Sequence, residues 1–218
     1  MALVVSIENA HLHGDVIPSM LRLRYKEFKV RQDYNIPVFK EMEYDTYDTP
    51  AASYIVWRDA QGCVRGCSRM APTDRAYMIR DLWPDMVSKI PLPDGGAIWE
   101  SSRFCIDSGL PADLRREVKF RILYTKLQYA LSQGIDGMVG VMPPLIWRAV
   151  FTSSGWPIEH IGDVKTLHTG EKVVAGWIDV NARYLENLQD RAGFTLSNVH
   201  GFEFGNKENA AASFAFAV

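Results

Sequence analysis

The sequence predicts an α/β fold, a three-layer sandwich with a mixed central sheet and helices on both faces. Three observations predict it. Strand-like and helix-like segments alternate along the chain. Hydrophobic residues make up 47% and charged residues 23% of the 218 residues, the ordinary balance of a globular protein. No internal repeat, linker or low-complexity run divides the chain. We therefore expect one domain over 1–218, with a loosely held tail at 205–218.

The first fifty residues predict a strand, a helix and a loop. The apolar run 2–7 is strand-like. Asp15 is placed to cap a helix through 18–30, whose apolar residues recur at helical spacing. Residues 33–50 contain two prolines and many aromatic and acidic residues with weak periodicity. A loop of this length is a candidate binding or lid segment.

The middle of the chain predicts paired strands and then a helix between strands. Residues 53–58 and 63–70 alternate around a short turn and indicate a hairpin. A short helix with a stop at Trp83-Pro84 is expected at 79–89, followed by a strand at 97–106. The strongest helical pattern of the chain covers 111–133, where a proline lies near the start and Gly134 ends the helix.

The remaining segments continue the alternation. Residues 136–142 indicate a buried strand, 145–153 a helix, 172–180 another strand and 181–191 a last helix. The complete order of strands and helices resembles that of the acetyltransferase-like fold. A fold of this kind hosts many functions, so the function has to come from particular residues.

Charge and cysteine content narrow the class of protein. The formal net charge is −2, which gives no reason to expect nucleic acid as a partner. The three cysteines, Cys63, Cys67 and Cys105, are too few and too irregular for a disulfide framework and indicate a reducing compartment. They lack the companion ligands of a zinc site, so we expect no metal. No apolar run reaches the ~20 residues of a membrane span. We expect a cytoplasmic protein.

Six charged residues stand in apolar or loop settings where isolated charges are costly. They are Arg24, Asp45, Asp48, Arg69, Glu100 and Arg103. One interpretation is a structural ion-pair network that ties the 33–50 loop to the sheet. The other is a binding or catalytic site, because buried charges with shifted pKa values also gather at active sites.

These residues carry a resemblance to a known family. The stretches LRLRYKEFKVRQDY, EYDTYD, CSRM and IWESSRFCI resemble those of the acyl-homoserine-lactone synthases, the LuxI-type autoinducer synthases of quorum sensing. The likeness is strong over roughly 20–106 and looser beyond. Tyr34 stands where the family usually has tryptophan, and Trp83 where it has phenylalanine. Both exchanges keep an aromatic face.

The resemblance implies an acyltransferase reaction. The α-amine of S-adenosyl-L-methionine attacks an acyl thioester, and the carboxylate of the same substrate then closes the lactone and releases methylthioadenosine. Glu100 is the expected base for the amine, with Arg24 or Arg103 holding the substrate carboxylate. The expected S-adenosylmethionine-binding residues are Arg24, Phe28, Tyr34, Asp45, Asp48 and Arg103. Arg69 and Trp83 are expected to support them, and no cofactor is needed beyond the two substrates.

The acyl chain is expected between the strand 136–142 and the helix after it. Val141, Met142 and Trp147 are the predicted pocket walls. The family tends to have a threonine on this strand when it uses 3-oxo chains, and neither Val141 nor Met142 can donate a hydrogen bond. An unsubstituted or otherwise non-oxo chain is therefore expected.

The acyl donor is expected to be acyl carrier protein or acyl-coenzyme A. No loop typical of coenzyme A binding precedes the 111–133 helix, which favours the acidic carrier protein. Basic residues near that helix are its expected docking site, unless they form only a solvated helix face. They are Arg115, Arg116, Lys119 and Arg121, with Arg148 and Lys126 nearby. The rival function is a coenzyme A-dependent N-acyltransferase of the same fold that acts on another amine. A catalytically silent binding module is a further alternative.

Overall fold

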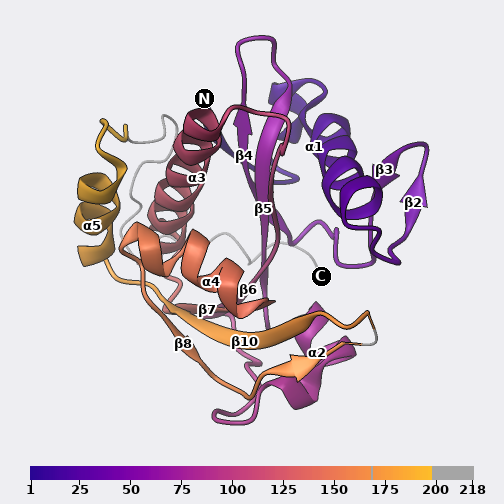
Figure 1. Cartoon of the computed structure of the whole chain (residues 1–218), viewed down its shortest axis with the longest axis vertical. Helices are drawn as coiled ribbons and strands as arrows, with labels where there is room; N and C mark the ends of the chain where they lie inside the picture. The colour runs from indigo at the N-terminus through magenta and orange to yellow at the C-terminus, as the bar shows by residue number, and fades with distance from the viewer. Residues whose placement is uncertain (168, 198–218) are drawn as a thin grey trace, which may run out of the picture.

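The computed structural model of the chain describes residues 1–167 and 169–197, so the predicted tail at 205–218 lies outside the described residues. These residues form a central sheet with helices on both of its faces (Figure 1), which confirms the predicted three-layer α/β sandwich. The helices are α1 (Val16–Arg24), α2 (Met78–Leu82), α3 (Ala112–Ser132), α4 (Pro144–Val150) and α5 (Arg183–Ala192).

The eight-stranded sheet runs in the order β1-β4-β5-β6-β7-β10-β8, and β9 pairs with β10 beside this path. Its strands are β1 (Ala2–Val5), β4 (Ser53–Arg58), β5 (Val64–Pro72), β6 (Ile98–Ile106), β7 (Gly137–Met142), β8 (Ile158–His160), β9 (Lys165–Thr166) and β10 (Lys172–Asp179). Only β6 and β7 run parallel, with α3 as the crossover between them. The strands β2 (Val38–Phe39) and β3 (Met42–Glu43) form a separate hairpin.

Alternation along the strands gives the sheet two apolar faces. Met70, Met138 and Met142 belong to the core on the side of α3, α4 and α5. On the opposite face, Val56 packs with residues of α1, and Val139 packs with residues of α2. Figure 1 shows α1 and α2 at different heights along this second face. The sheet surface between these two helices is where the charged residues gather.

Two irregularities of β6 shape that surface. Cys105 lies opposite Cys67 of β5, but Ser102 lies opposite Arg69, so two residues of β6 bulge against one of β5. Arg103 occupies the bulge with φ at 52°, a left-handed conformation that is rare for a residue with a side chain. On the other edge of β6, the pairing with β7 ends at Glu100 and Val139. Beyond this point β6 pairs only with β5, and the sheet opens between β6 and β7.

The structure corrects two predicted helices. The helix expected through 18–30 begins at Val16 after Asp15, but the Asp15 carboxylate pairs with Arg58 at 3.3 Å and does not cap the helix. After Arg24 the chain continues as the π-helical segment η2 (Tyr25–Arg31). The helix expected over 79–89 is shorter. It ends at Leu82, and Pro84 starts a 3-10 turn, η3 (Pro84–Met86), because proline cannot supply the next helical N–H.

Other segments were predicted only in outline. The loop expected at 33–50 contains the β2–β3 hairpin, whose turn has positive φ at Lys40 and Glu41. The strands β8 and β9 were not predicted, since both are shorter than the runs that periodicity detects. Two short 3-10 turns, η1 (Ala10–His13) and η4 (Thr152–Ser154), complete the described elements. No helix in the described ranges combines the length and apolar character of a membrane span.

Candidate active site

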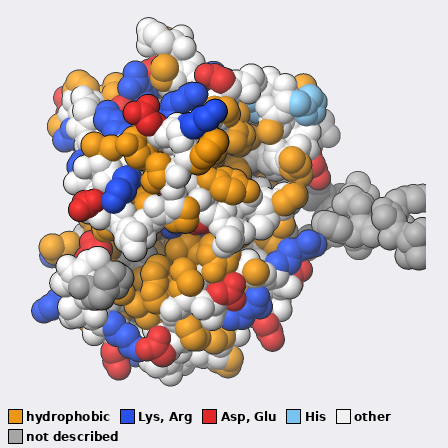
Figure 2. Space-filling view, turned by 90° about the vertical axis from the view of Figure 1, so that its right-hand side faces the viewer, with side chains coloured by type: hydrophobic (Ala, Val, Ile, Leu, Met, Phe, Trp, Pro, Cys, Tyr) orange, Lys and Arg blue, Asp and Glu red, His pale blue; other side chains and the backbone are white. Residues whose placement is uncertain are grey.

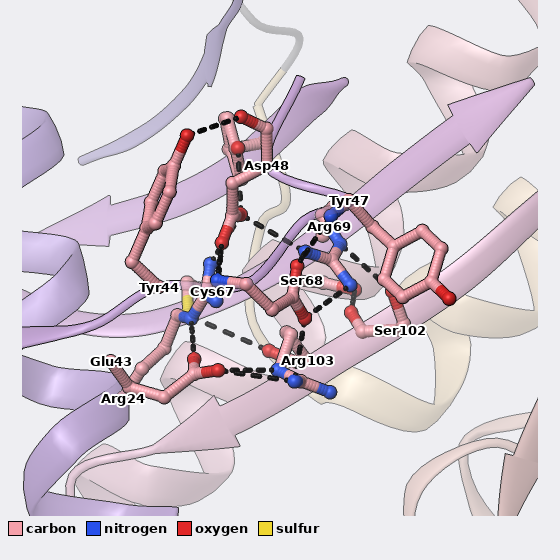
Figure 3. Close-up of polar contacts among 12 residues, drawn as sticks. Arg24, Glu43, Tyr44, Tyr47, Asp48, Cys67, Ser68, Arg69, Ser102 and Arg103 are labelled. Carbon is pink, nitrogen blue, oxygen red and sulfur yellow. Dashed lines mark hydrogen bonds and ion pairs between the residues drawn. The ribbon is translucent and has the colours of Figure 1, made fainter. Parts of the chain in front are cut away.

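A charged network joins α1 and the β3 loop to the central strands (Figure 3). Arg24, at the last turn of α1, is completely buried. Its Nη1 and Nη2 atoms donate to the two carboxylate oxygens of Asp48 at 2.7 and 2.8 Å, and its Nε donates to Glu43. All five N–H groups of an arginine are donors in a fixed fork, so this arrangement holds Arg24 in one position.

Arg69 extends the network from β5. Its guanidinium donates to both oxygens of Asp45, at 2.5 and 3.0 Å, and lies 3.0 Å from Asp48. Its Nε donates to the hydroxyl of Ser102 on β6 at 3.1 Å. The side chain of Arg69 is fully buried. Arg69 therefore fastens the acidic loop to the two middle strands of the sheet.

Arg103 reaches the same carboxylates from the bulge in β6. Its Nη2 lies 2.6 Å from Asp45 and 3.0 Å from Glu43. The left-handed conformation of Arg103 turns its side chain onto this face of the sheet. Its side chain is 14% exposed, whereas the side chains of Arg24 and Arg69 have no exposed surface. Arg103 is thus the most accessible of the three cations in the network.

The network is balanced in charge. Three arginines face three carboxylates, those of Glu43, Asp45 and Asp48. Burial by itself opposes ionisation of Asp48, but hydrogen bonds and charge from Arg24, together with the charge of Arg69, hold its pKa well below the usual range. Asp48 also accepts a hydrogen bond of 2.8 Å from the Tyr54 hydroxyl.

Glu100 lies beside the network and does not pair with it directly. Its carboxylate accepts hydrogen bonds from the backbone N–H groups of Ile79, at 2.8 Å, and Met78, at 3.3 Å. Burial raises its pKa, against the effects of those amides and of nearby Arg69 and Arg103. The Met78 sulfur lies 3.1 Å from Arg69 and 3.3 Å from Arg103, so Met78 contacts both guanidinium groups with its side chain and Glu100 with its backbone N–H.

The structure therefore brings together five of the six predicted charged residues and places Glu100 next to them. Glu43, Met78 and Ser102 were missed. Glu43 was missed because it lies on β3, in a segment that the sequence predicted to be a loop. No sequence pattern indicated Met78 or Ser102, whose roles depend on the register between β5, β6 and α2.

An aromatic pair flanks the network. The rings of Phe28 and Tyr34 are stacked, with centroids 6.3 Å apart and planes 9° apart. The Arg103 guanidinium lies 5.9 Å from the centre of the Phe28 ring. The Tyr34 hydroxyl donates to the Glu171 carboxylate at 2.9 Å, and burial together with Glu171 raises the pKa of Tyr34 to about 12. These rings place π faces beside the charged network.

The predicted acyl-pocket residues do not share one surface. Met142 belongs to the core beneath α3 and α4, whereas Val141 packs on the opposite face with the residues around α2. Trp147 of α4 is buried on the Met142 side, and its indole N–H donates to the Val174 carbonyl at 3.0 Å. Trp83 packs in the cluster around α2 and lies outside the charged network.

The surface near the network is hollowed. Figure 2 shows hydrophobic side chains gathered in a hollow across the middle of the molecule, between the part that carries α1 and the part that carries α2. The chain thus combines a buried ion network, a carboxylate with a raised pKa and an aromatic pair on one face of an open sheet. This face of the sheet therefore offers positive, negative and π surfaces close together.

Comparison with known proteins identifies the family. The autoinducer synthase family matches residues 9–188. The chain belongs to this family. The acyl-homoserine-lactone synthase of Vibrio anguillarum is 31% identical over 169 residues, which cover 76% of this chain and 87% of that protein. The enzyme of the same name from Ralstonia nicotianae is 30% identical over 75% of this chain and 82% of its own length.

Solved structures agree with this autoinducer synthase assignment. The acyl-homoserine-lactone synthase LasI covers 92% of this chain and 98% of its own, with a TM-score of 0.74 and 26% identity. BjaI, a coenzyme A-dependent acyl-homoserine-lactone synthase, aligns over 97% of both chains with a TM-score of 0.80. At 23% identity, this likeness is evidence for the fold alone. The chain is an acyltransferase of the kind that makes acyl-homoserine lactones for quorum sensing.

The basic residues of this autoinducer synthase have structural partners that the sequence did not indicate. Arg116 donates to the carbonyl groups of Ala192 and Arg191 at the end of α5, and Lys119 donates to that of Ala149 in α4. Arg115 likewise donates to the carbonyl groups of Ser108 and Leu110, at 3.2 and 2.5 Å. Arg115, Arg116 and Arg148 are nevertheless exposed. Lys126 is completely buried, so it does not belong to any surface cluster.

Proposed function

We propose that the charged network binds S-adenosylmethionine and that its α-amine is acylated there by an acyl thioester. The thiol carrier leaves first. The substrate carboxylate then attacks the γ-carbon, closes the homoserine lactone and releases methylthioadenosine. The observation that carries this proposal is the partly open Arg103 among buried ion pairs, beside the Phe28–Tyr34 stack. A rival N-acyltransferase that uses another amine has no need of this arrangement.

The exposure of the arginines supports separate roles for them. Arg24 is held by Asp48 and Glu43 on all sides, so we assign it to positioning the acidic loop. Arg103 has solvent access, and its planar fork fits the substrate carboxylate. The carboxylate of Asp45, which pairs with Arg69, balances the positive charge of the bound substrate.

The two cationic groups of the substrate need negative or π surfaces. The stacked rings of Phe28 and Tyr34 offer such faces for the sulfonium group. Asp45 and Asp48 supply the opposite charge to the ammonium group before it loses its proton. Arg69 holds Asp45 in place through two hydrogen bonds, whereas Trp83 packs around α2, the helix whose amides hold Glu100.

Glu100 is the proposed base for the amine. A neutral amine is required for attack on a thioester, and a carboxylate with a raised pKa accepts a proton more readily than an ordinary glutamate. The amide groups of α2 fix the direction of its lone pairs. The proton passes from the amine to Glu100, directly or through one water, as the carbon–nitrogen bond forms.

The acyl half of the site is proposed at the opening between β6 and β7. Met142 and Trp147 line the side under α4, and Val141 contributes from the opposite face. The donor is acyl carrier protein or acyl-coenzyme A. Arg115 and Arg148 remain exposed for contact with an acidic carrier. We propose further that 1–218 acts as one synthase domain in the cytoplasm, where free cysteines such as the described three are stable.

The test is an assay with both substrates. The purified full-length chain is incubated with S-adenosylmethionine and a mixture of acyl-carrier-protein and acyl-coenzyme A donors, and the products are followed by mass spectrometry. The proposal expects methylthioadenosine and an acyl-homoserine lactone in equal amounts. Acylation of another amine without release of methylthioadenosine would favour the rival function. High salt is expected to slow the reaction with carrier-protein donors more than with coenzyme A donors.

A further inference from the structure

Lys126 is a buried amine that the proposed chemistry does not use. It lies in the middle of α3 and has no exposed surface. Its Nζ donates to the hydroxyl oxygens of Ser68 on β5 and Ser101 on β6, both at 2.6 Å. None of the ion pairs in the described part of the chain involves Lys126. Two neutral hydroxyl groups are its hydrogen-bond partners there.

Such a side chain is costly to the fold. Lysine is rarely buried without a carboxylate, because the ammonium group loses its hydration. Burial lowers the pKa of Lys126 to about 7. An apolar residue of similar size would pack in this core at lower cost. A buried amine that has no carboxylate partner and lies beside a functional site is a candidate for substrate recognition.

The position of Lys126 connects it with the acyl half of the site. Ser101 follows Glu100, at which the pairing between β6 and β7 ends. The Phe151 ring lies 5.9 Å from the Lys126 Nζ and 5.3 Å from the Trp147 ring. The polar group of Lys126 and Ser101 thus lies where the sheet opens, beside the aromatic residues that are proposed to line the acyl chain.

The two serine hydroxyls account for two of the three hydrogen-bonding directions of the amine. An ammonium group donates three hydrogen bonds, and the two serine hydroxyls accept two of them. In the neutral amine the third direction carries a lone pair. A hydroxyl oxygen on the acyl chain suits either form, and a keto oxygen suits the ammonium form. A plain methylene chain would leave this direction without a hydrogen bond.

We propose that Lys126 and Ser101 bind an oxygen substituent near the thioester end of the acyl chain. This inference rests on the proposed function and names its acyl substrate class, a 3-hydroxy or 3-oxo acyl group. It reverses the expectation of a non-oxo chain, which considered only the strand 136–142. The hydrogen-bond donors that such an oxygen needs are Lys126 of α3 and Ser101 of β6, which lie outside that strand.

The test is a competition between donors of one chain length. Equal amounts of 3-hydroxy, 3-oxo and unsubstituted acyl donors on one carrier are supplied with S-adenosylmethionine, and the lactones are quantified by mass spectrometry. Wild type is expected to prefer the better oxygen-bearing donor by roughly 5-fold or more, the effect of one buried hydrogen bond. Lys126→Met and Ser101→Ala are each expected to reduce this ratio towards 1. Lys89→Met removes a surface charge and should leave it unchanged.

The outcomes separate this inference from the proposed function. Lactone formation in which wild type prefers the unsubstituted donor overturns the role of Lys126 and leaves the synthase assignment intact. The role of Lys126 is also overturned if wild type prefers an oxygen-bearing donor and neither variant changes that preference. Absence of lactone and methylthioadenosine with every donor overturns both. If Lys126→Met does not fold, Ser101→Ala still decides the test, because alanine lacks only the hydroxyl group of serine.

Discussion

Arg24 and Asp48 meet through two parallel hydrogen bonds of 2.7 and 2.8 Å in the buried space between α1 and the sheet. Neither side chain has more than 2% of its surface exposed. The pair fixes the acidic loop that carries Glu43 and Asp45 before any substrate arrives. The carboxylates that Arg103 touches are therefore already in place, and the most accessible arginine is the one free to exchange partners.

Breaking this pair should destabilise the fold. Asp48→Asn removes the charge that compensates buried Arg24, and removal of one partner from a buried pair costs about 3–5 kcal/mol. Urea unfolding should show this loss as a lower midpoint with an unchanged slope. The matched control is Asp33→Asn, which removes an exposed partner of Lys29 and should leave the unfolding midpoint almost unchanged. Equal effects of the two substitutions would contradict the assigned role of Asp48.

The buried amine should make stability depend on alkaline pH. Burial holds the pKa of Lys126 at about 7 in the folded state, well below its ordinary value of 10.5. Between these values the unfolded chain binds the proton and the folded chain does not. Stability should therefore rise with pH from about 7 to about 10, by at most about 1.4 kcal/mol per pH unit. Lys126→Met should remove this rise in thermal melting curves. An identical pH dependence in the variant would show that Lys126 is not a depressed titrating group.

Loss of the proposed base should affect turnover and spare the fold. Glu100→Gln keeps a carbonyl oxygen for the Ile79 amide but removes the proton acceptor. Turnover is expected to fall by about 10²–10⁴-fold, while the melting temperature changes little. The acidic limb of the pH–rate profile should also disappear. The exposed Glu186→Gln is the control. Near-normal turnover by folded Glu100→Gln would exclude Glu100 as the base.

Substitution of the accessible arginine should weaken substrate binding. Arg103→Lys keeps the charge but loses the fork that binds a carboxylate at two points. The KM for S-adenosylmethionine should rise by roughly 10-fold or more, equivalent to about 1.4 kcal/mol, with a smaller change in the KM for the acyl donor. Arg22→Lys, an exposed substitution on α1, should change neither KM. A greater effect on the donor KM would place Arg103 in the acyl half of the site.

The sequence predicted the parts that depend on local pattern. Alternating elements indicated the sandwich, and α3 was predicted to within one residue at each end. The spacing of Arg24 and Phe28 on one helix was also visible in the sequence. The contacts that these residues make could not be predicted from that spacing. Asp48 contacts Arg24 from a distant loop, and Arg103 contacts Phe28 from a bulge in β6.

Two misjudged features have clear physical reasons. Val141 and Met142 were predicted as one wall, although neighbouring residues of a strand point to opposite faces. Lys126 was grouped with surface charges, although Ile122, Leu123 and Leu127 around it are fully buried. The helical pattern identified the buried side of α3, but the partners of an amine on that side depend on β5 and β6.

The most direct test of the central claim is the release of methylthioadenosine by wild type and by a variant of Arg103. We expect methylthioadenosine and lactone in a 1:1 ratio from wild type with S-adenosylmethionine and an acyl donor. Arg103→Ala, still folded, should lose both products together at subsaturating S-adenosylmethionine. Wild-type product yields in that variant, or acyl transfer by wild type without methylthioadenosine, would contradict the account.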